Sequence, residues 1–166
     1  MPLSPLRRLS AGIALALALS VALHPVYGFV NEAISAALDA ATPYVEDSFE
    51  VREDNWSGQV EPGKPLLVRH QLFRGNEYWF WAGTSWPGAT VEVQIFDGKG
   101  DPIGLEQFSS DGKAGVRALP KSTGTYFIQV IINYEPPSDP AELAELENNW
   151  GAYEGSVDWG LVYGYR

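Results

Sequence analysis

Residues 119–132 read Leu-Pro-Lys-Ser-Thr-Gly-Thr-Tyr-Phe-Ile-Gln-Val-Ile-Ile, a turn of small residues followed by a run with an apolar residue at every second position. The alternating apolar residues are Tyr126, Ile128, Val130 and Ile132. Successive side chains of a β-strand point to opposite faces, so this period of two predicts a strand with one face in a core. The stretch therefore predicts a half-buried strand that begins after a glycine turn.

The same period of two recurs on both sides of this stretch. The alternating residues are Leu66, Val68, His70 and Leu72, then Tyr78 and Phe80, then Val91, Val93 and Ile95, and finally Val157, Trp159, Leu161, Tyr163 and Tyr165. Weaker strands are expected within residues 103–108 and 115–119. Turns rich in Gly, Pro and Asp separate these segments. Short strands with short turns predict an all-β protein, an antiparallel β-sandwich.

Two helices are expected beside the strands. Apolar residues recur at helical spacing through residues 29–42, where Asn31 is expected to cap the helix and Pro43 to end it. A second, short helix is expected in a late loop, with Asp139 as N-cap and Pro140 at its first position. The chain therefore combines a sandwich with an N-terminal amphipathic helix and a helical insert.

The late loop, residues 133–151, forms an acidic insert without a basic residue. Its acidic residues include Glu135, Asp139, Glu142, Glu145 and Glu147. One interpretation is a solvated surface helix that fills a long connection. The other is a binding surface, because connections of this length are often functional.

The N-terminus has the organisation of a signal peptide. Arg7 and Arg8 precede an apolar run over residues 11–23, which is shorter than the ~20 residues that a permanent membrane span needs. We predict cleavage before Phe29, which divides the chain into a signal peptide (1–28), an N-terminal helix and linker (29–48) and the sandwich (49–166). The expected location is the periplasm or the extracellular medium, and an uncleaved membrane tether is the alternative.

The charge and the cysteine content exclude several classes of function. The chain has 11 basic and 21 acidic residues, and loss of Arg7 and Arg8 changes its net charge from −10 to −12. Such a surface repels phosphate backbones and anionic headgroups, so we expect no nucleic-acid or membrane partner. The absence of cysteine excludes disulfides, thiol nucleophiles and Cys-ligated metals. We expect no cofactor.

Three segments carry a family resemblance: residues 72–80 (Leu-Phe-Arg-Gly-Asn-Glu-Tyr-Trp-Phe), 88–100 (Gly-Ala-Thr-Val-Glu-Val-Gln-Ile-Phe-Asp-Gly-Lys-Gly) and 119–130, quoted above. Over about residues 56–165 the chain resembles the bacterial pre-peptidase C-terminal domain, a jelly-roll-like β-sandwich found on secreted peptidases and other exported proteins. The resemblance implies that fold and an exported setting, and it implies no reaction. Aspartates that contribute to calcium sites in some members are missing from residues 91–96.

Groups that could perform catalysis are scarce. His24 leaves with the signal peptide, and His70, which remains, is interpreted as a partly buried strand residue. The segment Asp97-Gly-Lys-Gly-Asp101 is interpreted as a glycine-rich turn, because Lys99 occupies the middle ligand position of a possible calcium loop. We therefore predict no catalytic residue, no metal ligand and no enzyme.

The tryptophans are the candidate ligand-binding residues. Period two places Trp79 and Trp81 on the face opposite Tyr78 and Phe80, where two indoles would either be covered by the N-terminal helix or stack on sugar rings. We favour the helix, because a helix this short is marginal unless it packs. Trp86, in Ser85-Trp-Pro-Gly, lies in an expected loop, and Trp150 ends the acidic insert.

These features predict an exported, noncatalytic binding module. Trp86 and Trp150 would hold a glycan or another secreted protein, and the acidic insert would set electrostatic selectivity. The resemblance suggests a second hypothesis, an accessory or inhibitory partner of a secreted peptidase. The third alternative is a hydrolase whose activity would depend on His70. The fourth is a structural protein of the cell envelope, and the oligomeric state stays open.

Overall fold

The computed structural model describes residues 31–166, and the predicted signal peptide, residues 1–28, lies outside the described residues. The elements in chain order are α1 (Glu32–Val45), β1 (Glu50–Val60), β2 (Leu66–Leu72), β3 (Tyr78–Gly83), β4 (Thr90–Phe96), β5 (Gly104–Ser110), β6 (Lys113–Ala118), β7 (Gly124–Asn133), α2 (Pro140–Trp150) and β8 (Val157–Tyr165). Every strand expected from the alternation is present. Neither helix in the described range is long and apolar enough to cross a membrane.

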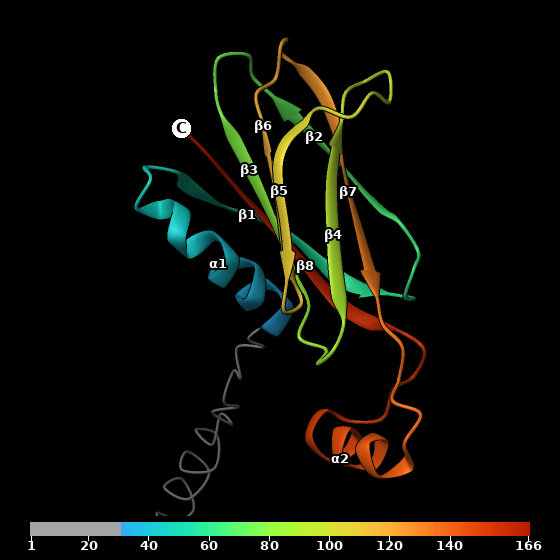
Figure 1. Ribbon diagram of the computed structural model, residues 1–166. Coiled ribbons are helices and arrows are strands. Elements are labelled where there is room, and N and C mark those ends of the chain that lie inside the picture. Colours follow the sequence, from blue (N-terminus) through green and yellow to red (C-terminus); the bar gives the residue numbers. More distant parts are fainter. Residues whose placement is uncertain (1–30) are drawn as a thin grey trace, which may run out of the picture.

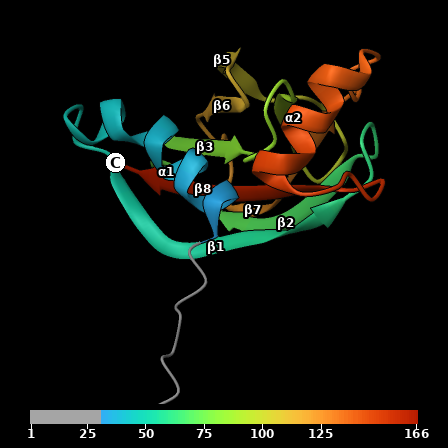
Figure 2. The same cartoon turned by 90° about the horizontal axis from the view of Figure 1, so that it is seen from below.

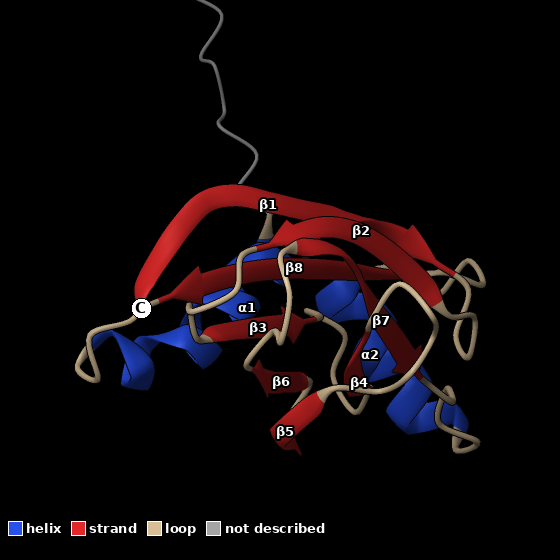
Figure 3. Cartoon of the chain, turned by 90° about the horizontal axis from the view of Figure 1, so that it is seen from above, coloured by secondary structure: helices blue, strands red, loops and turns tan. Residues whose placement is uncertain are grey.

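The strands form two antiparallel sheets that pack face to face (Figure 1). One sheet has the order β1-β8-β3-β6-β5 and the other the order β2-β7-β4. Seen from above, β8, β3, β6 and β5 follow one another across the larger sheet (Figure 3). Strands from opposite ends of the chain become neighbours, β1 with β8 and β2 with β7, as in a jelly roll. The prediction of an antiparallel, jelly-roll-like sandwich with two helices is confirmed.

The alternating side chains fill the space between the two sheets. Ile95 of β4 lies opposite Ile128 of β7, and Val91 lies opposite Ile132. All four are at most 1% exposed, and they form one core with residues from β3, β6 and β8. The period of two in the sequence therefore assigns the core face of these strands correctly.

Helix α1 lies against the outer face of the larger sheet, beside β3 and β8 (Figure 2). It covers Trp79 and Trp81, which are 2% and 0% exposed, and their stacked indole rings lie 6.1 Å apart between centroids. The helix presents alanines such as Ala37 and Ala41 to this layer. The expectation of helix packing is confirmed, and the alternative of an open indole platform for a ligand is corrected, because both rings are buried.

Two glycines of the sheet allow this close approach of the helix. A Cβ atom on Gly83 would lie 2.7 Å from the backbone nitrogen of Ala37, and one on Gly160 would lie 2.7 Å from backbone atoms of Ala33. Neither distance is compatible with a side chain, since non-bonded carbon atoms prefer about 3.5–4.0 Å. Glycine at these two positions therefore allows α1 to pack at a short distance from the sheet and its two indole rings.

The helix does not end at Pro43, as the sequence predicted, but continues to Val45. A proline nitrogen cannot donate a hydrogen bond, so near the end of a helix it removes only one backbone bond. The last turn is held by Tyr44, whose ring lies 4.4 Å from that of Trp79 and 5.5 Å from that of Trp81. Packing of this side chain explains why the helix continues past the proline.

Strand β1 was not expected from the sequence. It is an edge strand with a register shift between Val51 and Asn55, and most of its residues are exposed, so it lacks a regular apolar alternation. Trp56 of this strand is partly buried against the core. Its ring lies 5.4 Å from that of His70 and 5.9 Å from that of Tyr163.

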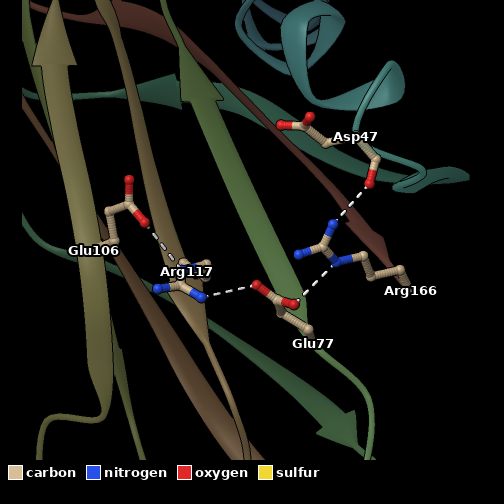
Figure 4. Close-up of polar contacts among 5 residues, drawn as sticks. All are labelled: Asp47, Glu77, Glu106, Arg117 and Arg166. Atoms are coloured by element: carbon tan, nitrogen blue, oxygen red, sulfur yellow. Dashed lines mark hydrogen bonds and ion pairs between the residues drawn. The ribbon is translucent and has the colours of Figure 1, made fainter.

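A network of charged residues ties the C-terminus to the sheet (Figure 4). The carboxylate of Glu77 accepts hydrogen bonds from Arg117 Nη1 and Arg166 Nε, each at 2.9 Å. Arg117 Nε lies 3.1 Å from Glu106 Oε2, and Arg166 Nη1 donates to the carbonyl of Asp47 at 2.8 Å. Burial tends to raise the pKa of Glu77, but the two arginines together outweigh burial and lower it.

Candidate ligand-binding site

The β3–β4 loop, residues 84–89, is fixed by a side chain from β8. Asp158 Oδ1 accepts hydrogen bonds from the Thr84 hydroxyl at 2.9 Å and from the Ser85 backbone nitrogen at 3.0 Å. Asp158 Oδ2 accepts from the Ser85 hydroxyl at 2.7 Å. A partly buried carboxylate with three donors is well satisfied, so it holds the residues before Trp86 in one conformation.

The Trp86 ring is oriented by two tyrosines, one at the start of the acidic insert and one just after it. Its centroid lies 5.4 Å from that of Tyr134 and 5.6 Å from that of Tyr153, and the two tyrosine rings lie 5.1 Å apart. Tyr134 is buried, its hydroxyl has no hydrogen-bond partner within the described residues, and burial raises its pKa. Aromatic pairs at such distances prefer edge-to-face contacts, which give this cluster a defined geometry.

Helix α2 projects from the sandwich beyond the ends of β7 and β8 (Figure 1). As predicted, Asp139 is its N-cap, and the carboxylate accepts a hydrogen bond from the Ala141 nitrogen at 2.8 Å. The helix has no buried residue, and Trp150 at its end is 50% exposed. Folding of the sandwich therefore leaves a large part of this indole in solvent.

Trp86 and Trp150 line the same cavity, which has a volume of about 410 Å³ and which we call the loop-end pocket. The start of α1, the end of β1, the β3–β4 loop, the end of α2 and the start of β8 contribute to it. Its lining residues are Glu32, Gln59, Ser85, Trp86, Trp150, Ala152, Glu154, Ser156 and Asp158. The tertiary structure thus brings the two loop tryptophans of the sequence analysis together.

Two further hollows adjoin the loop-end pocket. One, of about 270 Å³, runs along α2 and shares Trp150 with the pocket. The other, of about 410 Å³, is lined mainly by the β3–β4 loop and shares Ser85 and Trp86 with the pocket. Pro87 lines both of these hollows. We call the three hollows, which share these lining residues, the concave surface.

The acidic residues of the insert are divided between this surface and open solvent. Glu142 and Glu145 line the hollow along α2. Glu135, Asp139 and Glu147 line none of the three hollows, and the Asp139 carboxylate is engaged as the helix cap. Two of the five acidic residues named as candidates from the sequence, Glu142 and Glu145, therefore line the concave surface.

Several residues of the pocket were not found by sequence reasoning. Glu32 lies at the start of α1, whereas Glu154 and Asp158 lie just before and at the start of β8, and no motif connects Glu32 with the other two. One signal existed for Asp158, which is a charged residue inside the otherwise apolar run of the last strand. Tyr134 and Tyr153 had another, because these two aromatics lie on either side of the acidic residues of the insert.

His70 lies away from this surface, between the two sheets. Its ring lies 4.5 Å from that of Tyr163 and 6.3 Å from that of Phe80. Burial lowers the pKa of His70, and the nearby charge of Asp54 only partly offsets this. These contacts agree with the interpretation of a partly buried strand histidine.

The glycine-rich turn after β4 uses its first carboxylate to hold its own backbone. Asp97 Oδ1 accepts hydrogen bonds from the backbone nitrogens of Lys99 at 2.8 Å and Asp101 at 3.0 Å. The Asp101 and Lys99 bonds are the main causes that lower the pKa of Asp97. Within residues 31–166, no three His, Asp or Glu side chains converge in a way that could hold a metal ion.

No family model and no curated protein matches this chain. Among solved structures it is similar to Aeromonas hydrophila PliG, a periplasmic lysozyme inhibitor of g-type lysozyme. The identity is 18%, the match covers 68% of this chain and 85% of that chain, and the TM-score is 0.40. A similarity this low carries no argument about the fold or the function.

Proposed function

We propose that the chain is a noncatalytic binding module that captures a partner at the loop-end pocket. The observation that carries this proposal is that Trp86 and Trp150, which are far apart in the sequence, line one cavity. Ligand sites are typically concave, with aromatic walls and a few fixed polar groups. Tryptophan is also enriched in protein interfaces, where an apolar ring with a polar edge suits a partly wet contact.

The exposure of Trp150 supports a role in binding. A fully buried indole would stabilise a fold by several kcal/mol, whereas Trp150 stays 50% exposed on a helix with no buried residue. Trp86, in contrast, is held in place by Tyr134 and Tyr153. One rigid and one exposed indole suit a site whose ligand covers the exposed ring on binding.

The polar groups of the pocket support binding rather than catalysis. Within residues 31–166 no histidine lines the pocket, and the Ser85 hydroxyl donates its hydrogen bond to Asp158. The lining therefore lacks the histidine that activates a serine nucleophile in a hydrolytic triad. The ligand would be a glycan or another secreted protein, in the exported setting that the predicted signal peptide implies.

A second candidate function is that of an accessory or inhibitory partner of a secreted peptidase. It rests on the resemblance to the pre-peptidase C-terminal domain. The three segments that carry this resemblance include parts of β3, β4 and β7. Pull-down with secreted peptidases tests this candidate. Self-association in sedimentation experiments, with no captured partner, would favour a structural envelope protein instead.

The test is a glycan array and a pull-down from secreted proteins, with Trp86→Phe, Trp150→Ala and Phe73→Ala compared with the native protein. Phe73 is the matched control, since it is an aromatic residue that is 52% exposed just after β2 and lines none of the three hollows. We expect binding to be lost in Trp150→Ala, weakened in Trp86→Phe and retained in Phe73→Ala. Binding that is unaffected by both tryptophan changes would contradict the site.

A further inference from the structure

Among the residues that the structure describes, the charged residues around the loop-end pocket are all acidic. Glu32, Glu154 and Asp158 line the pocket, and the two adjoining hollows add Glu142, Glu145 and Asp111. Of the chain's 11 Lys and Arg residues, Arg7 and Arg8 lie outside the described residues, and none of the others lines these hollows. Within residues 31–166, the charge on the concave surface around the two indoles is therefore negative.

The carboxylates of the pocket have no cationic partner within residues 31–166. Glu77, Glu106 and other acidic residues pair with arginine or lysine, whereas none of the ion pairs of this range includes Glu32, Glu154 or Asp158. The donors to Asp158 are neutral hydroxyl and amide groups. These donors orient the carboxylate without neutralising it, so its negative charge remains available to a ligand.

The aromatic walls favour the same sign of ligand. The face of an indole carries negative quadrupole charge and attracts an ammonium or guanidinium group, most strongly where water is partly excluded. Trp86 and Trp150 provide two such rings beside the Asp158 and Glu154 carboxylates. A neutral sugar would stack on the rings but leave the charges unused, and an anionic ligand would be repelled.

We infer that the loop-end pocket binds a lysine or arginine side chain of a basic protein, an inference that rests on the proposed function. A protein is favoured over a small amine because the concave surface extends beyond one cavity. The hollow along α2 shares Trp150 with the pocket, and the hollow at the β3–β4 loop shares Trp86. A basic partner would insert one cationic side chain and place further positive charge near Glu142 and Glu145.

The test is titration of the purified protein with an oligolysine peptide, followed by tryptophan fluorescence and calorimetry. A neutral oligosaccharide, an oligoglutamate peptide and tetramethylammonium are titrated in parallel. We expect the oligolysine peptide to bind, to bind more weakly at high salt, and to lose binding in Trp150→Ala. We expect no binding of oligoglutamate.

Two double variants separate the pocket from the general acidity of the chain. Glu32→Gln with Glu154→Gln removes two charges from the pocket, and Glu46→Gln with Glu53→Gln removes two exposed charges that line none of the three hollows. We expect the pocket variant to bind oligolysine roughly 5- to 10-fold more weakly, as for two modest ion pairs, and the control to bind nearly as tightly as the native protein. Equal weakening in both variants would overturn the inference, because it would indicate attraction to overall charge.

The other outcomes distinguish this inference from the proposed function. Binding of the oligosaccharide that Trp150→Ala abolishes, with no binding of oligolysine, would overturn the cationic ligand and leave the binding module in place. Binding of tetramethylammonium without oligolysine would overturn the protein partner in favour of a small amine. If no probe binds and partner capture does not depend on Trp86 or Trp150, both proposals fail.

Discussion

Replacement of Gly160 by alanine should separate α1 from the sheet without any change in polarity. A Cβ atom at this position would lie 2.7 Å from the carbonyl carbon and oxygen of Ala33 and from the nitrogen of Ile34. These are backbone atoms of the helix, so no side-chain rotation can relieve the contact. The helix must withdraw by roughly 1 Å to reach a normal non-bonded distance.

The expected loss follows from what the helix covers. Complete exposure of Trp79 and Trp81, now 2% and 0% exposed, would cost about 4–6 kcal/mol for each indole as an upper limit. A shift of this size loses only part of the contact energy of the layer, as in other overpacked cores. We therefore expect Gly160→Ala to lower the free energy of unfolding by about 1–3 kcal/mol.

The assay is urea denaturation monitored by tryptophan fluorescence and by far-UV circular dichroism. Gly124→Ala is the matched control, because a Cβ atom there meets nothing within 4 Å and the residue does not need a left-handed conformation. The control should be neutral or stabilising by up to about 1 kcal/mol. Gly160→Ala with the same stability as Gly124→Ala would refute the proposed role of glycine in helix packing.

Three further predictions concern polar groups that are partly or fully buried. The pKa of Glu77 is lowered in the folded state, so its ionised carboxylate stabilises the fold fully above its usual pKa and less as the pH falls below about 4.5. The urea midpoints of the native protein and of Glu77→Gln should therefore converge in acid. The depressed pKa of His70 means that the folded state resists its protonation, so stability should fall as the pH drops below about 6.5, and His70→Phe should lose this dependence. An imidazole pKa at or above 6.5 in an NMR titration would contradict this argument. Tyr134→Phe removes a buried hydroxyl that has no hydrogen-bond partner within residues 31–166, so in thermal unfolding the variant should be as stable as the native protein or more stable by about 1 kcal/mol. A lower melting temperature would show that this hydroxyl forms a hydrogen bond in solution.

Residue patterns predicted two parts of the candidate site, the loop that carries Trp86 and the helix that ends at Trp150. The dipeptide Trp86-Pro87 identified a loop tryptophan, and the capping signals at Asp139 and Pro140 placed the helix that ends at Trp150. The contribution of Asp158 could not be predicted, because strand alternation does not show which loop a polar residue will meet. The sequence analysis also left Trp79 and Trp81 with two alternatives, and only the position of α1 decided between them.

Local residue patterns were enough to predict the class of the fold, the core face of most strands, the presence of both helices and the acidity of the insert. These features depend on side-chain period, on caps and on turns within a few residues. Three other features could not be predicted in this way: the pairing of β1 with β8, the continuation of α1 beyond Pro43 and the cavity that Trp86 and Trp150 both line. Each of these depends on contacts between segments that are distant in the chain, and such contacts form only when the whole sandwich closes around its core.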